Sequence, residues 1–130
     1  MNQNPWSNLD WKGKRILVAE DEEVNMIFFQ EVLEETGVEI LQAEDGAQAL
    51  EIARKEDIDL VLMDIKMPVM NGLDATRAIK SIKPQLPIVA QTAYALDEEK
   101  QKCFQAGCDD YISKPIDTIR LFTILKKYLH

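Results

Sequence analysis

Short, unbroken runs of apolar residues alternate with helical patterns along this chain, and the alternation limits its possible folds more than any other property. The runs lie at residues 16–19, 60–63 and 88–90, a similar one at 38–41 is interrupted by Glu39, and a weaker one lies at 111–113. A short run without polar residues is typical of a strand that is buried on both faces of a parallel sheet. The sequence therefore predicts five such strands.

Apolar residues recur at helical spacing after each of these runs. The expected helices lie around residues 24–32, 47–53, 73–79, 96–106 and 119–129. In the first helix the recurring residues are Val24, Ile27, Phe28 and Val32. A (βα)5 order predicts an α/β fold, in which a doubly wound parallel sheet carries helices on both faces.

The first 14 residues differ from the rest of the chain. They are polar and contain Pro5, Gly13 and the tryptophans Trp6 and Trp11. We interpret residues 1–14 as an N-terminal linker or arm and residues 15–130 as one domain, whose size suffices for a hydrophobic core of its own.

Composition argues against several classes of protein. No apolar stretch is long enough to cross a bilayer, and no signal peptide is visible at the N-terminus. The cysteines Cys103 and Cys108 form no zinc-binding spacing and are interpreted as reduced thiols of a cytoplasmic protein. A net charge of −8 argues against nucleic-acid binding by this segment.

Acidic residues follow two of the expected strands directly. Glu20 and Asp21 come after the first strand, and Asp64 comes after the third. Sites in open α/β sheets form beyond the carboxyl ends of the strands, so these acids converge if the two strands are neighbours. Two carboxylates about 4 Å apart repel each other by roughly 4 kcal/mol, and a cation such as Mg²⁺ would remove this cost. Helix capping is the alternative, and it suits Asp21 but not Asp64.

A hydroxyl and an ammonium follow the two remaining strands. Thr92 comes after the fourth strand, and Lys114 comes after the fifth. Beside an acidic metal site, these groups would neutralise and hydrogen-bond the oxygens of a phosphoryl group. Either residue alone would be an ordinary surface residue, so their coincidence at one edge carries the prediction.

Four segments of the chain resemble the receiver domain of bacterial response regulators, which has the flavodoxin-like fold of the chemotaxis-type regulators. The segments are Ile16–Glu22, Val61–Gly72, Thr92-Ala93 and Ser113-Lys114-Pro115, and the similarity extends from about Lys14 to Leu129. The resemblance implies a five-stranded parallel sheet with strand order 2-1-3-4-5.

The resemblance also implies a role for each residue at this edge of the sheet. Asp64 would accept a phosphoryl group from the phosphohistidine of a histidine kinase or a histidine phosphotransfer domain. Thr92 would hydrogen-bond that group, and Lys114 would pair with it. The ligands of Mg²⁺, or of Mn²⁺ in its place, would be Asp21, Asp64, the backbone carbonyl of Lys66 and, less directly, Glu20, where Asp is more usual.

Three further features are implied by the resemblance. The Lys114–Pro115 peptide bond would be cis. Thr92 and Tyr111 would form a switch that carries the effect of phosphorylation to the fourth and fifth helices, through which receiver domains would also self-associate. Lys66 and Tyr94 would flank the approach of a hydrolytic water, and since neither carries a carboxylate or carboxamide, we expect slow loss of the phosphoryl group.

The residues of these motifs are most similar to those of receiver domains in hybrid histidine kinases. We therefore expect a receiver domain excised from such a kinase, with a stand-alone regulator as the alternative. The domain would be cytoplasmic, although the parent protein could be membrane-anchored. The domain would promote its own phosphotransfer and autodephosphorylation.

Two other functions are weighed against the phosphoacceptor. An aspartyl-phosphate hydrolase of the haloacid-dehalogenase type needs a second Asp two residues after its nucleophile, and Lys66 stands there. A flavodoxin needs a hydroxyl- and glycine-rich loop after the first strand to hold phosphate, whereas residues 20–23 of this chain are all acidic. Both alternatives are therefore disfavoured.

Overall fold

The computed structural model describes residues 9–93 and 97–129 of the chain. One sheet of five parallel strands has the order β2-β1-β3-β4-β5. The strands are β1 (Arg15–Ala19), β2 (Glu39–Ala43), β3 (Leu60–Asp64), β4 (Ile88–Thr92) and β5 (Asp110–Ser113). The predicted fold class and strand order are confirmed.

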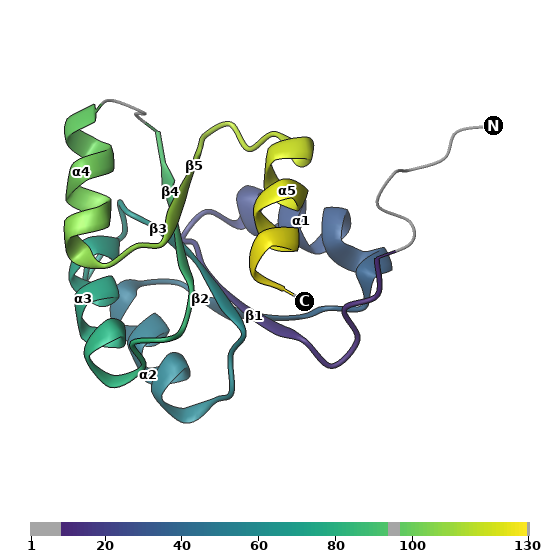
Figure 1. Cartoon of the computed structure of the whole chain (residues 1–130), viewed down its shortest axis with the longest axis horizontal. Coiled ribbons are helices and arrows are strands. Elements are labelled where there is room, and N and C mark those ends of the chain that lie inside the picture. The colour runs from purple at the N-terminus through teal and green to yellow at the C-terminus, as the bar shows by residue number, and fades with distance from the viewer. Residues whose placement is uncertain (1–8, 94–96, 130) are drawn as a thin grey trace.

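Helices cover both faces of the sheet (Figure 1). They are α1 (Glu23–Leu33), α2 (Gly46–Lys55), α3 (Gly72–Ile82), α4 (Asp97–Ala106) and α5 (Thr118–Tyr128), and the short 3-10 helix η1 (Glu34–Thr36) extends α1. Helices α1 and α5 lie on one side, and α2, α3 and α4 lie on the other (Figure 1). Two buried apolar clusters, one on each face, join these helices to the strands.

Helix α1 buries a different set of apolar residues from the set named by spacing. Its buried side chains are Met26, Phe29 and Leu33. Val24 is 77% exposed and Ile27 is 45% exposed. The segment is apolar on nearly every side, so the spacing predicts a helix without showing which stripe faces the sheet.

The described end of the predicted arm packs against the domain. Trp11 is only 4% exposed, and its ring stacks on Phe122 of α5 with 6.1 Å between the centroids. The Trp11 backbone N–H donates to the carbonyl of Thr36 at 2.7 Å. The domain boundary at residue 15 stays a prediction, and Trp6 lies outside the described residues.

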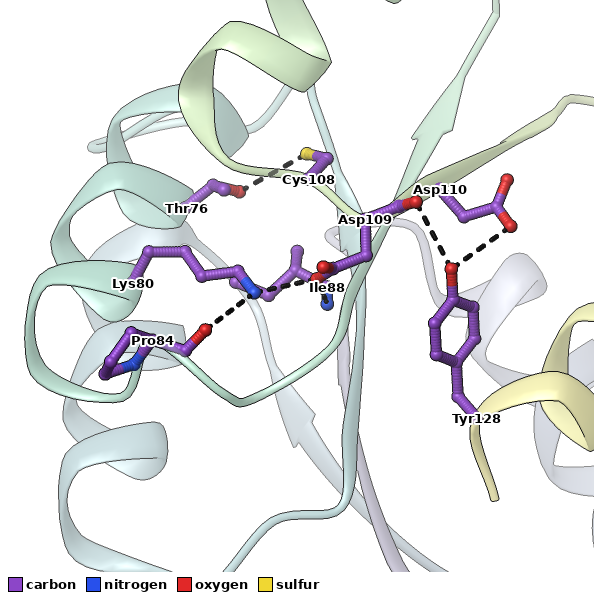
Figure 2. A network of polar contacts seen from close by, with 8 residues as sticks. All are labelled: Thr76, Lys80, Pro84, Ile88, Cys108, Asp109, Asp110 and Tyr128. Carbon is purple, nitrogen blue, oxygen red and sulfur yellow. Dashed lines mark hydrogen bonds and ion pairs between the residues drawn. The ribbon is translucent and has the colours of Figure 1, made fainter. Parts of the chain in front are cut away.

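A polar network fastens β5 at its amino end, away from the strand ends that carry Lys114 (Figure 2). The Lys80 ammonium on α3 lies 2.7 Å from the carboxylate of Asp109, which also accepts the backbone N–H of Ile88 at 2.9 Å. From α5, the Tyr128 hydroxyl donates to the Asp109 carbonyl at 3.2 Å. These contacts tie β5 to helices on both faces of the sheet.

Helix α3 begins close against the end of β3. The Asn71 side chain caps the helix by accepting the backbone N–H of Asp74 at 2.9 Å. The N–H of Gly72 donates to the carbonyl of Ile65 at 2.9 Å. A Cβ atom added to Gly72 would overlap the backbone carbonyl oxygen of Asp64, so the loop can approach Asp64 only because this residue is glycine.

We expect Gly72→Ala to destabilise the domain by about 1–3 kcal/mol, because the clashing atoms belong to the backbone and cannot move aside. Urea unfolding would measure the change. Arg77→Ala, on the same helix, is the matched control, since it removes only an exposed ion pair with Asp74 and should cost less than about 1 kcal/mol. Equal stability of Gly72→Ala and the wild type would contradict the close approach.

Candidate functional site

Three carboxylates meet where β1 and β3 end. Asp64 is the last residue of β3, and Glu20 and Asp21 follow β1 on the neighbouring strand. One carboxylate oxygen from each of the three lies within 4.8 Å of the others. Glu20 is fully buried and Asp64 nearly so, whereas Asp21 is exposed at the rim. The predicted convergence of these acids is therefore found in the structure.

Lys114 supplies the positive charge of this cluster. Its Nζ lies 2.9 Å from Asp64 Oδ2 and 3.5 Å from Glu20 Oε1. Lys114 follows β5 directly, and its peptide bond to Pro115 is cis. The side chain thus reaches across from the edge of the sheet to the two buried carboxylates.

Backbone amides hold the second oxygen of each buried carboxylate. The N–H of Lys66 donates to Asp64 Oδ1 at 3.1 Å, and the N–H of Glu22 donates to Glu20 Oε2 at 3.2 Å. Glu20 Oε1 is buried without a hydrogen-bond partner among the described residues. The predicted use of the Lys66 carbonyl as a metal ligand stays a prediction.

The crowding of charge shifts two pKa values in the cluster. Burial, followed by repulsion from Asp64, raises the pKa of Glu20 to about 7. Burial acts to lower the pKa of Lys114, but the hydrogen bond and the charge of Asp64, together with Glu20, outweigh it and leave that pKa raised. Lys114 therefore stays charged at neutral pH, and Glu20 keeps its proton to about pH 7.

An open cavity adjoins the cluster. Its volume is about 180 Å³, and it is lined by Glu22, Asp64, Ile65, Lys66, Gln91, Thr92, Ala93, Glu99 and Lys114. Thr92 ends β4, beside Asp64 at the end of β3. The cavity is large enough for several water molecules, so a phosphoryl group on Asp64 would fit between Thr92 and Lys114.

Tyr111 lies outside the carboxylate cluster. Its half-buried ring meets Phe104 of α4 edge to face, with 6.3 Å between the centroids, and the Lys100 ammonium lies 4.9 Å from the ring centre. Tyr111 packs with the core beneath α4, and Ile112, the next residue of β5, packs beneath α1 and α5. The predicted switch role of Tyr111 stays a prediction, and Tyr94 lies outside the described residues.

Sequence reasoning missed Gln91, a lining residue of the cavity. Gln91 is the Cα partner of Asp64 in the β3–β4 pairing. The sequence did offer an indication, since Gln91 is a polar residue within a strand whose five residues are all buried. The exposed Glu22 and the half-buried Glu99 were also missed, because the many acids of a chain with charge −8 cannot be told apart by type alone.

Residues 16–126 match the family model of the response regulator receiver domain. The chain belongs to this family. Among curated relatives, the polar-differentiation response regulator DivK of Brucella ovis is 37% identical over 118 residues, which make up 89% of this chain and 96% of the relative. The chain is thus a receiver domain of two-component signalling.

Solved structures of receiver domains share both the fold and part of the sequence. The receiver domain of a sensor histidine kinase from Pseudomonas aeruginosa, which has a magnesium ion coordinated in its active site cleft, is 36% identical, with a TM-score of 0.83 over 89% of this chain and 97% of that one. A Saccharomyces cerevisiae receiver domain, crystallised with a histidine phosphotransfer signalling protein, is 25% identical, with a TM-score of 0.85 over 89% of this chain and 88% of that one.

None of the helices in the described part of this receiver domain has both the length and the apolar composition that crossing a bilayer requires.

The metal-free domain should lose stability as the pH rises from about 4.5 to about 7. The unfolded chain releases the Glu20 proton near its ordinary pKa of 4.5, whereas the folded domain keeps it to about 7, so the folded state binds more protons in this range. The loss should be on the order of 3 kcal/mol. Thermal melts in EDTA at several pH values would measure it.

Glu20→Gln is the matched variant for this pH dependence, because it keeps the shape of the side chain and removes the titrating group. We expect its stability to vary less with pH than that of the wild type, and to exceed it above pH 7. Parallel curves for the two proteins would contradict the assignment of the pH dependence to Glu20.

Proposed function

We propose that Asp64 is the phosphoacceptor of this receiver domain and takes its phosphoryl group from a phosphohistidine. The contact between Lys114 Nζ and Asp64 Oδ2, at 2.9 Å beside the open cavity, is the observation that carries the proposal. It places a positive charge beside a nearly buried carboxylate while leaving one side of that carboxylate open to a donor. The donor is a histidine kinase or a histidine phosphotransfer protein.

The transfer exchanges one bond to phosphorus for another. An Asp64 carboxylate oxygen attacks the phosphorus, the P–N bond to the donor histidine breaks, and the imidazole nitrogen leaves with the electron pair and takes up a proton. Lys114 then pairs with the phosphoryl oxygens, and the Thr92 hydroxyl donates a hydrogen bond to one of them. Positioning and charge neutralisation account for most catalysis in reactions of this kind.

The proposed cofactor is Mg²⁺, with Mn²⁺ as an alternative. The donor set fits a hard cation, because it contains only oxygen ligands and includes the buried Oε1 of Glu20, which accepts no hydrogen bond from the described residues and lies 3.5 Å from Lys114 Nζ. The residues that would hold the ion are Glu20, Asp21, Asp64 and the backbone carbonyl of Lys66. When bound, the ion supplies positive charge to the carboxylates and the phosphoryl oxygens.

The exposed apolar side of α1 is the proposed docking surface for the phosphodonor. A groove of about 280 Å³ lies directly beside the site, and its lining includes Val24, Phe28, Lys114 and Ile116. Lys114 lines both this groove and the cavity over Asp64, so a partner in the groove would lie beside the site of transfer. The exposed Val24 would give a partner helix apolar area to bury near the site of transfer.

Several finer expectations belong to this proposal. The domain comes from a hybrid histidine kinase, although one relative in the comparison is a response regulator that the chain covers almost completely. It works in the cytoplasm, and its output and any self-association use α4, β5 and α5 through Thr92 and Tyr111. Slow loss of the phosphoryl group, expected from Lys66 and Tyr94, favours back-transfer over rapid reset.

Asp64→Asn should abolish phosphorylation by acetyl phosphate while leaving the domain as stable as the wild type or more stable, because a neutral side chain relieves the repulsion from Glu20. The wild type should gain one acid-labile phosphoryl group, detected by mass, only when Mg²⁺ is present. Asp21→Asn should keep the nucleophile and lose most of the Mg²⁺ response. Phosphorylation that persists in Asp64→Asn would show that another acid is the acceptor.

The double substitution Val24→Ala and Ile27→Ala should slow transfer from a phosphorylated histidine phosphotransfer protein at least tenfold, and leave labelling by acetyl phosphate unchanged. Both side chains are exposed, so the fold should be little affected. Ile82→Ala is the matched control, because Ile82 is 46% exposed on α3, across the sheet. Equal slowing by the control would place docking elsewhere.

A further inference from the structure

Gln91 is a buried polar side chain that packing does not explain. It is fully buried, and neither Oε1 nor Nε2 has a hydrogen-bond partner in the described part of the chain. Burying an amide without a hydrogen-bond partner costs free energy of folding. An apolar side chain of similar size would fill this position of β4 without that cost. The contacts of the resting structure therefore do not explain why a carboxamide stands here.

The sheet places Gln91 beside the phosphorylation site. Gln91 is the Cα partner of Asp64 on one side and of Ile112 on the other. Residues two apart in a strand point to the same face. The residues two positions before Asp64, Gln91 and Lys114 all belong to the core beneath α1 and α5: Leu62, Val89 and Ile112. The Gln91 side chain therefore shares a face with Asp64 and Lys114.

In the resting state the Asp64 carboxylate already has a donor on each oxygen. Oδ1 accepts the N–H of Lys66, and Oδ2 accepts the Lys114 ammonium. Gln91 lines the same cavity as these groups, but its amide makes no bond to them. The Gln91 amide is therefore a hydrogen-bond donor beside the reacting carboxylate that the resting structure does not use among the described residues.

We propose that Gln91 is a positioning residue whose carboxamide becomes hydrogen bonded when Asp64 is phosphorylated. This rests on the proposed function, in which Lys114 turns to the phosphoryl oxygens and withdraws from Asp64. The Nε2–H₂ group of Gln91 then donates to the side-chain oxygen of Asp64 that has lost its partner. Phosphorylation thereby removes the cost of an unpaired amide, so Gln91 shifts the conformational equilibrium toward the phosphorylated arrangement.

Beryllofluoride with Mg²⁺, a stable mimic of the phosphoryl group, provides the test. In the wild-type domain, the side-chain amide signals of Gln91 are identified by their absence from the NMR spectrum of Gln91→Met. We expect these signals to shift downfield and to exchange more slowly with water when the probe binds. Gln91→Met should melt at a higher temperature than the wild type without the probe, yet bind the probe about three- to tenfold more weakly, as the loss of one hydrogen bond predicts.

Val89→Ala is the matched control, because Val89 lies two residues earlier on the same face of β4. It should lower the melting temperature and leave probe affinity unchanged, which separates loss of packing from loss of the amide. Unmoved Gln91 signals in a wild-type domain that binds the probe, or equal probe affinity of Gln91→Met, would overturn the inference and leave the proposed function standing. A wild-type domain that fails to bind the probe would overturn both.

Discussion

The ammonium of Lys114 stabilises the carboxylate cluster, because the other charged side chains of the cluster are carboxylates that repel one another. Lys114 lies 2.9 Å from one oxygen of Asp64 and 3.5 Å from one of Glu20, and Asp21 adds a third acid at the rim. One positive charge cannot balance three negative ones where burial weakens the screening by water. A proton on Glu20 relieves part of this repulsion, and a bound cation would relieve it too, so proton binding and metal binding would compete at this site.

The parallel register of the sheet produces this concentration of charge. All five strands point the same way, so their carboxyl ends form one edge, and residues far apart in the sequence meet there. At the amino end, Asp109 and Tyr128 tie β5 to α3 and α5. The amino end of β5 is thus held by ion pairs and hydrogen bonds to the helices. At the carboxyl ends of the strands, the buried side chains of Glu20 and Gln91 have polar atoms without a hydrogen-bond partner among the described residues.

The groups that would change partners during transfer are immediate neighbours. Lys114 borders both the cavity over Asp64 and the apolar groove beside α1. A partner that docks in the groove therefore touches the same strand end that supplies the positive charge. Gln91 lies between Asp64 and β5, and its amide has no hydrogen-bond partner among the described residues. The proposed docking groove, the proposed phosphoacceptor and the buried amide thus lie at adjacent strand ends.

The sequence by itself determined the (βα)5 fold, its strand order through the family resemblance, and the acids at the strand ends, because buried strands and helices leave periodic patterns in a chain. Only the tertiary structure decided that Met26 rather than Val24 faces the core, that Trp11 stacks on Phe122, and that Gln91 adjoins Asp64. These contacts depend on which helix or strand packs against which, and the apolar periodicity of one segment does not indicate its neighbours in the fold. Local pattern fixes the elements, whereas burial and pairing are properties of the assembled layers.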